Sequence, residues 1–494
     1  MNYGGYNHSM RLPALIAGII AAVLGAWLIL IMQHLQTKWL VAFLAGTFVL
    51  LAALASGRFE RVVQTMLFLI IPINVDFNFD MGVSLYSLRI SEGTPLLGIS
   101  AVDILLCFLY LAWIFRLMQP QKPGHKERVV WPYGSWFIWG FMLWGAFSMF
   151  NAENRQLSLF LLFGFLKAFL LFFYIANNIK TRRDLWLVVQ CLILGLIAES
   201  LLGLAQQAAG RNLGLSALGE RTIEKEVSIA GEKIFRIGGT LGHPNYFGGY
   251  LTSVLPLIYA FTQIRLPPLA RILAMFSLAL GTVVLVLTYS RSAWLASFAA
   301  LGFLFVYQMI KSGKQLPVIP TVIAVLLSMA VLTPLMPQIK ARMEEDDRGS
   351  TSSRIPQVKM AWSMIKDHPV IGVGLNNNGL VSHLYETYVE EQSGNKRVFE
   401  YQAIHNVFLA LTAETGIPGI LWLISFVVIT VRQGRKKITS IQDPVAKTIL
   451  FGMLVSLIAR IPHDAFHTGN LAANTFFWLY AACLVADFED TRNG

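Results

Sequence analysis

Long apolar runs, separated by short polar breaks, follow one another along most of this chain. Most runs are about 20 residues long, the length at which a helix crosses the hydrocarbon core of a bilayer. The pattern therefore predicts an all-α integral membrane protein with about 12–14 transmembrane helices. The approximate extents of the predicted helices are 12–32, 39–56, 62–75, 99–117, 132–150, 157–178, 186–207, 245–264, 271–289, 292–310, 316–335, 405–431, 445–461 and 470–486.

The composition agrees with this interpretation. Of the 494 residues, 55% are hydrophobic and 14% are charged, whereas soluble proteins carry roughly 25% charged residues. The first run, Leu12 to Met32, is too long for the apolar part of a cleavable signal peptide, so we expect it to remain as the first helix. Cys107, Cys191 and Cys483 each lie inside an apolar run, which predicts buried thiols and no disulfides.

Lys and Arg residues indicate the orientation of the chain. They concentrate in alternate loops, which the positive-inside rule assigns to the cytoplasm, together with both termini. The short outer loops carry only scattered cations such as Lys38 and Arg155. The formal net charge of +11 therefore indicates cytoplasmic loops and no nucleic-acid partner. The inner loops hold Arg58, Arg61, Lys122, Lys126, Arg128, Lys180, Arg182, Arg183, Arg265, Arg271, Lys311, Lys314, Arg432, Arg435, Lys436 and Lys437.

Two segments, 208–244 and 336–404, are too long and polar to be simple connectors, and both fall outside in this topology. Loops of more than about 15 residues usually carry function. In the second segment, apolar residues recur at helical spacing from Ile355 to Ile365. They predict an amphipathic helix that is capped within 351–353, ends before Pro369, and lies on the membrane or covers a cavity.

These features divide the chain into three expected parts. An N-terminal transmembrane bundle occupies 1–207, and a core that includes both outer segments occupies 208–435. A C-terminal transmembrane pair with a cytoplasmic tail occupies 436–494. Most candidate functional residues fall in the middle part.

The first candidate segment runs from Arg236 to Gly249 and reads RIGGTLGHPNYFGG. Glycines allow backbone amides to approach a ligand, and the forked guanidinium of Arg236 suits a phosphate. His243 and Asn245 are interpreted either as ligand-binding side chains or as caps of the helix that follows.

The second candidate segment, Tyr289 to Trp294, reads YSRSAW and joins two predicted helices with almost no loop. Arg291 falls at head-group depth, where a lipid diphosphate would present its charge. A single interfacial arginine also serves as a snorkelling anchor. We favour phosphate binding by Arg291, with Tyr289 beside it.

The third candidate segment begins at His405, where the second outer segment enters the membrane. A histidine there suits a general base because it titrates near neutral pH, and Asn406 follows it. Glu414 lies nine residues on, about 13 Å along and on the opposite side of a straight helix. It can orient His405 only if Gly416 and Pro418 break that helix.

Weaker patterns point to neither a metal nor a nucleotide. The sequence GVGL at 372–375 lacks the lysine of a nucleotide-binding loop, and the acidic run 344–347 is typical of a solvated face. His463 and His467 have the i, i+4 spacing that suits zinc, with Asp464 between them, but a third ligand is not evident. We therefore expect no metal and no cofactor.

Two charged residues fall near the middle of the membrane on consecutive predicted helices. Lys167 and Glu199 are each costly at that depth, by about 2.5–3.5 kcal/mol for a lysine. We expect them to neutralise each other. A structural pair is the favoured interpretation, and a proton path in a transporter is the alternative.

At these residues the chain resembles the O-antigen ligase and O-antigen polymerase superfamily of bacterial membrane glycosyltransferases. The resemblance is strongest from about Arg236 to Gly419 and rests on the order of four motifs: RxxG with GHPN, YSRSAW, PVIGVG, and HN followed by ETGIPG. It implies a glycosyltransferase-C type fold, an undecaprenyl-diphosphate-linked glycan as donor, and transfer without a metal. It also implies a place in the bacterial plasma (inner) membrane with an extracytoplasmic active face. The chain has about two more predicted helices than the usual ligase, so the subfamily stays open.

The resemblance assigns roles to individual residues. By position, Arg236 and Arg291 match the diphosphate-binding arginines of the family, and His405 matches its proposed base, so we expect these three to be catalytic. A diphosphate leaving group needs charge stabilisation and an acceptor hydroxyl needs a base, and direct attack inverts the anomeric centre. The expected substrate-binding residues are His243, Asn245, Tyr289, Arg354, Asn406 and Glu414.

The favoured function is that of an O-antigen ligase or a polysaccharide polymerase, with a glycan or lipid acceptor and with membrane lipids as further partners. A lipid-linked glycan flippase or another polysaccharide transporter is the alternative, since about 14 helices is a natural number for that class. A transporter concentrates polar residues at mid-membrane along a pathway. Here they concentrate at one face, with Lys167 and Glu199 as the main exception.

Overall fold

The computed structural model describes residues 57–73, 76–78, 98–120, 128–220, 226–229, 232–312, 354–385, 388–392, 395–399, 404–467 and 470–488, with the single positions 333, 336, 337 and 340. Outside these residues lie the predicted helices 12–32 and 39–56, the predicted helix 316–335 apart from residue 333, the acidic run 344–347 and the cap within 351–353. Contacts divide the chain into Met1–Gln64 and Thr65–Gly494. The packing that follows is that of the second unit.

The described part of the chain is mostly helical. Seven of its helices, α4, α6, α7, α9, α10, α15 and α16, are long and apolar enough to cross a membrane, which confirms an all-α integral membrane protein. The helices are α3 (Phe59–Ile70), α4 (Ala101–Met118), α5 (Ser135–Ser148), α6 (Arg155–Asn178), α7 (Arg182–Ala209), α8 (Pro244–Thr262), α9 (Pro268–Leu287), α10 (Arg291–Ser312), α13 (Arg354–Asp367), α14 (Asn378–Val381), α15 (Val407–Ser440), α16 (Pro444–Asp464) and α17 (Thr475–Val485).

Local sequence sets where these helices begin. Each of α4 and α7 opens on a capping box, in which Ser100 pairs with Asp103 and Thr181 pairs with Asp184. The side chain of Asn154 accepts hydrogen bonds from two amides in the first turn of α6, and a proline stands in the first turn of α8, α9 and α16. These residues satisfy or remove amides that a helix leaves unpaired at its start.

Three short antiparallel strand pairs, which the hydrophobic pattern does not predict, lie in the connections between helices. Two of them fall in the long polar segments 208–244 and 336–404. The pairs are β1 (Asp76–Asn78) with β2 (Gly98–Ser100), β3 (Glu226–Ile229) with β4 (Glu232–Phe235), and β5 (Tyr388–Gln392) with β6 (Asn395–Phe399).

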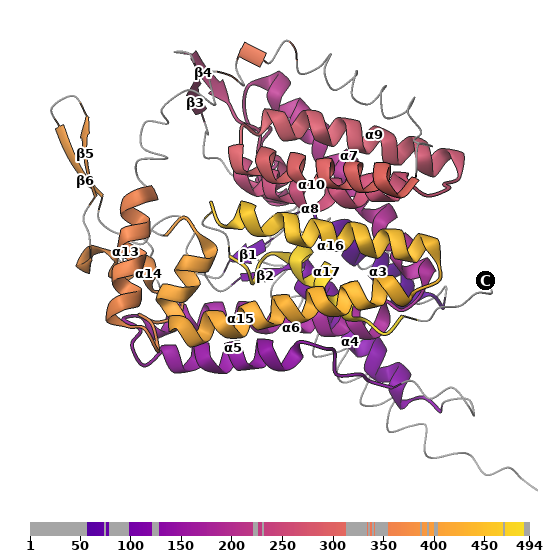
Figure 1. Ribbon diagram of the computed structural model, residues 1–494, viewed down its shortest axis with the longest axis horizontal. Helices are drawn as coiled ribbons and strands as arrows, with labels where there is room; N and C mark the ends of the chain where they lie inside the picture. The colour runs from indigo at the N-terminus through magenta and orange to yellow at the C-terminus, as the bar shows by residue number, and fades with distance from the viewer. Residues whose placement is uncertain are drawn as a thin grey trace, which may run out of the picture. The chain divides into compact units, whose positions relative to one another are not determined.

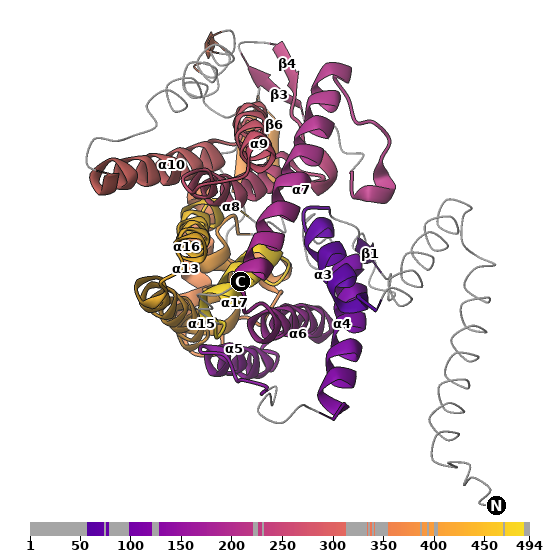
Figure 2. The same cartoon turned by 90° about the vertical axis from the view of Figure 1, so that its right-hand side faces the viewer.

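Helix α8 occupies the centre of the packing. It is buried along most of its length and packs against α16, α10 and α9 (Figures 1 and 2). Small residues bring the axes close: a methyl group at Gly248 would meet Ala293 at 2.7 Å, and one at Gly452 would meet Ala260 at 2.9 Å. Close backbone approach is how helices associate in a bilayer, where lipid removes the hydrophobic driving force between them.

Chain direction and contacts sort the helix ends into two groups. The α6–α7 and α15–α16 turns share one end, because Arg182 and Asp443 form an ion pair at 3.8 Å. The α5–α6 turn lies at the other end, where Asn154 N donates to Asn377 Oδ1 at 2.8 Å. Since consecutive helices alternate in direction, the start of α8, the α9–α10 turn, the start of α15 and the end of α16 fall at this second end. We call it the loop end.

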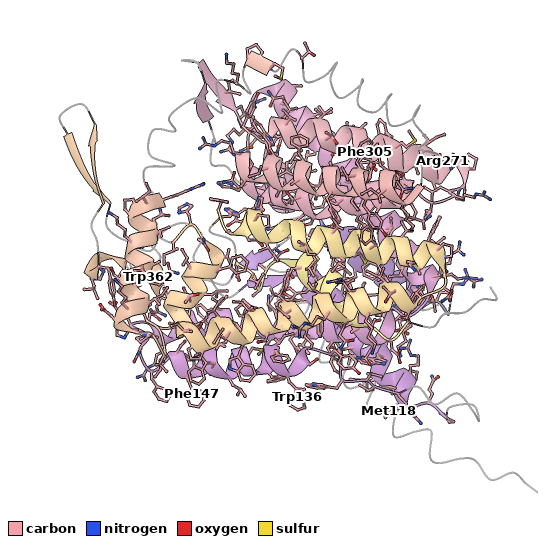
Figure 3. The ribbon with its side chains drawn as sticks, viewed as in Figure 1. Met118, Trp136, Phe147, Arg271, Phe305 and Trp362 are labelled. Carbon is pink, nitrogen blue, oxygen red and sulfur yellow. The ribbon has the colours of Figure 1, made fainter. Side chains whose placement is uncertain are left out.

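Helix α13 confirms the predicted amphipathic helix. Met360 and Met364 are buried against residues of the segment 373–413, whereas Ile355 and Trp362 are exposed. The helix runs across the direction of α15 at the loop end (Figure 1). Figure 3 places Trp362 and Arg271, in the first turn of α9, at opposite ends of the helices.

The predicted pairing of Lys167 with Glu199 is wrong. Lys167 Nζ lies 2.7 Å from Asp103 Oδ2 and donates to Gly98 O at 2.8 Å, so it is neutralised at the start of α4. Glu199 instead accepts hydrogen bonds from Thr240, with Thr240 N at 3.0 Å. Sequence position indicates the depth of a residue in the membrane, but it does not indicate toward which neighbour the helix turns that residue.

Candidate functional site

The turn between α9 and α10 is held by Arg236. The guanidinium donates to two carbonyl oxygens of the turn, Thr288 O from Nε at 2.9 Å and Tyr289 O from Nη2 at 3.4 Å. Tyr289 is buried and has a φ of +49°, a conformation that is strained for a residue with a side chain. Arg291 follows as the first residue of α10. Arg236 therefore fixes the turn from which Arg291 projects.

The start of α8 is joined to the same arginine. His243 is its N-cap, and His243 Nδ1 accepts from Asn245 N at 3.0 Å. The side-chain oxygen of Asn245 accepts from Arg236 Nη2 at 2.9 Å. The predicted capping role is confirmed for His243, whereas the side chain of Asn245 binds Arg236. In the neutral ring of His243, Nε2 must carry the proton, since Nδ1 accepts.

The glycine-rich loop before α8 rests on two buried side chains of α7. Besides Glu199, which accepts from Thr240, Gln206 Oε1 accepts from Gly238 N at 3.3 Å and from Gly239 N at 2.9 Å. Sequence analysis missed Gln206 entirely and paired Glu199 with the wrong partner. Polar residues inside an apolar run were the signal, because buried polar groups need hydrogen-bond partners.

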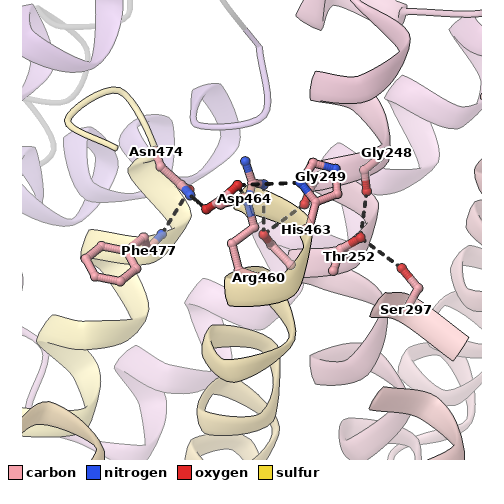
Figure 4. A network of polar contacts seen from close by, with 10 residues as sticks. Gly248, Gly249, Thr252, Ser297, Arg460, His463, Asp464, Asn474 and Phe477 are labelled. Atoms are coloured by element: carbon pink, nitrogen blue, oxygen red, sulfur yellow. Dashed lines mark hydrogen bonds and ion pairs between the residues drawn. The ribbon is translucent and has the colours of Figure 1, made fainter. Parts of the chain in front are cut away.

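A buried charge network lies at the end of α16 (Figure 4). Arg460 Nε donates to Asp464 Oδ1 at 2.7 Å, and Arg460 Nη1 reaches Ser253 Oγ of α8 at 3.4 Å. Asn474, the N-cap of α17, donates to the other oxygen of Asp464 at 3.4 Å. The network joins three helices at the loop end. Sequence analysis did not consider Arg460, although an arginine four residues before an aspartate at the end of an apolar run indicates such a pair.

Three histidine rings gather beside this network. The His467 ring lies 5.7 Å from that of His463 and 6.1 Å from that of His243, with the ring of Tyr246 at 4.7 Å. Burial, followed by the charges of neighbouring residues that include His243 and His405, holds the pKa of His467 well below its usual value. His467 is therefore neutral near pH 7. Among the described residues, no group of three His, Cys, Asp or Glu side chains is placed to hold a metal ion.

His405, directly before the N-cap of α15, is near enough to His467 to contribute to the lowering of its pKa. It is exposed, and both its backbone N and its Nδ1 lie within hydrogen-bond distance of Gln357 Oε1, at 3.1 and 2.9 Å. Arg354, at the start of α13, lies with its guanidinium carbon 5.8 Å from the centre of the Phe466 ring, next to His467. Helix α13 thus contacts both the predicted base and the segment directly after α16.

Asn406 and Glu414 support the chain around His405. Asn406 is the N-cap of α15 and accepts from two amides of its first turn. Glu414 is buried and accepts from Asn378, and Asn378 Oδ1 in turn accepts from Ile404 N at 3.2 Å. Gly416, with a φ of +70°, interrupts the helix as the sequence required. Glu414 is connected, however, to the backbone of Ile404, the residue before His405, and the connection runs through the side chain of Asn378.

The GVGL segment at 372–375 belongs to the loop that follows α13. Gly372 and Gly374 have φ values of +76° and +100°, and Gly374 N donates to Glu414 O at 3.1 Å. This loop packs against the interrupted part of α15. It is a structural support of the His405 region.

The predicted residues thus lie at one end of the bundle. Arg236 joins Asn245 to the turn before Arg291. The His467 ring contacts that of His243, and His405 is near enough to influence the pKa of His467. Helix α13 carries Arg354. Residues 276–424 match the family described as O-antigen ligase. The matched region includes Tyr289, Arg291, Arg354, His405, Asn406 and Glu414, while Arg236, His243 and Asn245 precede it. No curated protein matches the chain.

Proposed function

On the premise that this chain belongs to the O-antigen ligase and polymerase superfamily through residues 276–424, we propose that it transfers a glycan from undecaprenyl diphosphate to a glycan or lipid acceptor. The family match supports glycan transfer of the ligase or polymerase type. The donor, the acceptor, the roles of individual residues and the face of the membrane are parts of the proposal.

One observation carries the proposal: a histidine that can accept a proton lies at the same helix end as a set of arginines. His405 is near enough to His467 to contribute to the lowering of its pKa, and the His467 ring lies 6.1 Å from that of His243 at the start of α8. The start of α8 is tied through Asn245 to Arg236 and the turn before Arg291. Separate segments of the chain therefore supply the base and the cations that this transfer needs.

The proposed reaction is a single displacement. His405 accepts the proton of the acceptor hydroxyl while its oxygen forms a bond to the anomeric carbon of the donor. The bond between that carbon and the diphosphate breaks, and undecaprenyl diphosphate leaves with the electron pair. Arg291 and Arg236 neutralise the developing charge, an effect of about 2.7–4 kcal/mol for each such donor, and a general base contributes about 10²–10⁴-fold. Attack from the opposite side inverts the anomeric centre.

The distribution of cations supports an extracytoplasmic site in a bacterial inner membrane. The end opposite to the loop end carries Lys180, Arg182 and Arg183 in the α6–α7 turn and Arg265 and Arg271 around the start of α9. Clustered cations mark cytoplasmic loops. The loop end, with the candidate site, then faces outward.

The test is transfer in proteoliposomes that contain purified lipid-diphosphate glycan and an acceptor extract. We expect wild type to transfer or lengthen the glycan, and His405→Ala and Arg291→Ala to lose 10²-fold or more of the rate. Arg271→Ala is the matched control, because it removes an arginine from the opposite end, and it should keep full activity. The product size ladder separates a polymerase from a ligase.

Two outcomes would overturn the proposal. If His405→Ala and Arg291→Ala keep full activity, the catalytic assignment fails. If wild type only moves the donor between leaflets, the protein is a transporter.

A further inference from the structure

Gln357 makes an unusual double contact with His405. A single oxygen, Gln357 Oε1, lies 3.1 Å from the backbone N of His405 and 2.9 Å from its Nδ1. Gln357 lies in the first turn of α13 and is 5% exposed. A buried side chain from one segment thus holds an exposed ring from another.

The first contact decides the orientation of the amide. A backbone N–H can only donate, so the atom of Gln357 that it meets must be the carbonyl oxygen. The same oxygen cannot donate to Nδ1. The second contact therefore requires that Nδ1 of His405 carries a hydrogen and donates it.

The position of that hydrogen fixes the chemistry of the ring. With Nδ1 protonated, the neutral imidazole accepts a proton at Nε2 alone. The Nδ1–H bond to Gln357 persists in the imidazolium form, so taking up a proton at Nε2 needs no change of partner. A base held in this way accepts and returns a proton at one defined atom.

The surroundings of Gln357 keep the amide in place. The buried side chains next to it on α13, Met360, Ala361 and Met364, form one cluster with Ile404 and with residues of the 373–413 segment. Ile404 precedes His405 directly and is anchored by Asn378. Helix α13 therefore positions both the backbone and the ring of the histidine.

We infer that Gln357 is a positioning residue that holds His405 as the Nδ1–H tautomer, with Nε2 as the atom that takes the proton of the acceptor. The inference rests on the proposed role of His405 as base. It adds the partner that selects the basic nitrogen, and it assigns to α13 a part in assembling the site.

Several charged or titratable groups surround this pair and stay unchanged in the test. His467, beyond the end of α16, interacts electrostatically with His405. Arg354 lies three residues before Gln357 on α13, and Glu414 of α15 is linked through Asn378 to Ile404. Because all of them are present in every variant of Gln357, differences between those variants report on Gln357 alone.

The test compares two substitutions of Gln357 in the proteoliposome assay across pH. Gln357→Leu removes the acceptor, and we expect kcat to fall about 10-fold or more. Gln357→Glu keeps an acceptor and adds a charge that stabilises the imidazolium. It should keep most of kcat at high pH and move the acidic limb of the pH–rate profile upward by about one unit.

Asn378→Ala is the matched control, because it removes the anchor of Ile404 without touching the ring. It should lower kcat and leave the acidic limb where it is. Equal profiles for wild type and Gln357→Glu, or an unchanged kcat in Gln357→Leu, would overturn the inference while the proposed function stands.

A second measurement is independent of activity. Solid-state ¹⁵N spectra of histidine-labelled protein, with His405→Ala to identify the signals, report which ring nitrogen carries the hydrogen. We expect a protonated Nδ1 in wild type and an increased share of the Nε2–H tautomer in Gln357→Leu. A wild-type ring with an unprotonated Nδ1 contradicts the inference, whether or not transfer is observed.

Discussion

Arg236 shows, at the scale of single residues, why a site residue is hard to separate from a structural one. It was expected to grip a phosphate, and in the structure its guanidinium holds the carbonyls of the α9–α10 turn and the side chain of Asn245. The two roles are compatible, since Arg291 projects from the turn that Arg236 fixes. His243 and Asn406 likewise act as helix caps at positions where ligand binding is also proposed.

His467 leads to a prediction about pH and stability. In the unfolded chain a histidine takes up a proton below about pH 6.5, whereas buried His467 stays neutral in the folded state because its pKa is held well below that value. The free energy of unfolding therefore falls as pH drops below about 6.5, by up to about 1.4 kcal/mol per pH unit from this group. His467→Gln, which cannot titrate, should lose less stability between pH 7 and pH 5.

The measurement is the unfolding midpoint of detergent-solubilised wild type and variant at pH 5, 6, 7 and 8. The difference between the unfolding midpoints of the two proteins at pH 8 gives the effect of the substitution that is independent of protonation. Parallel curves from pH 8 to pH 5 would show that His467 takes up its proton as easily in the folded protein as in the unfolded one.

At the scale of elements, the interruption of α15 at Gly416 allows the membrane helices to pack against the loop that follows α13. Gly416 has a φ of +70° and a ψ of 179°, and the next residue, Ile417, donates to Pro369 O at 2.8 Å. The interruption lets the loop after α13 pack directly against α15. The sequence indicated it through Gly416 and Pro418.

Gly416→Ala should therefore destabilise the protein strongly. A Cβ at this position would lie 2.3 Å from Val370 O and 2.8 Å from Pro369 O, and backbone oxygens cannot move aside as a flexible side chain can. Together with the strained dihedral angles, we expect a loss of more than about 3 kcal/mol in the free energy of unfolding.

Gly210→Ala is the matched control, because Gly210 also has a positive φ, +62°, but a Cβ there would meet nothing within 4 Å. It should lose only about 1–2 kcal/mol, the penalty of the left-handed conformation. Unfolding midpoints in detergent compare the two variants. Similar losses would mean that neither the contact with 369–370 nor the ψ of 179° at Gly416 adds to the cost of a positive φ.

At the scale of the whole molecule, alternation of helix direction places the candidate residues at one end and the basic turns at the other. The ion pair between Arg182 and Asp443 joins two of those basic turns. This separation is the basis for an outward-facing site, and it can be tested without any knowledge of the substrate.

We predict that the two ends react differently with a membrane-impermeant maleimide. In a background without Cys107, Cys191 and Cys483, Glu153→Cys in the α5–α6 turn should be labelled in spheroplasts of a bacterial host. Ser440→Cys, at the end of α15 beside the α15–α16 turn, should be labelled only after the membrane is permeabilised. Both positions are exposed in the structure, so a reversed pattern would place the candidate site on the cytoplasmic side.

The sequence by itself determined the class of the protein, the positions of most described helices and the amphipathic helix α13. These follow from the length and spacing of apolar runs and from caps such as Asn154 and Asp443, which act within one turn of the chain. It also indicated the resemblance to the O-antigen ligase family, which residues 276–424 match. Each of these properties depends on residues that are close together along the chain.

Only the tertiary structure decided which side chains meet. The hydrophobic pattern places Lys167 and Glu199 at similar depths but leaves open the rotation of each helix, and so their partners proved to be Asp103 and Thr240. The contact of Gln357 with His405 spans 48 positions and depends on how α13 packs. A contact of this kind depends on how all the helices of the bundle pack together. That arrangement cannot be read from any short stretch of the sequence.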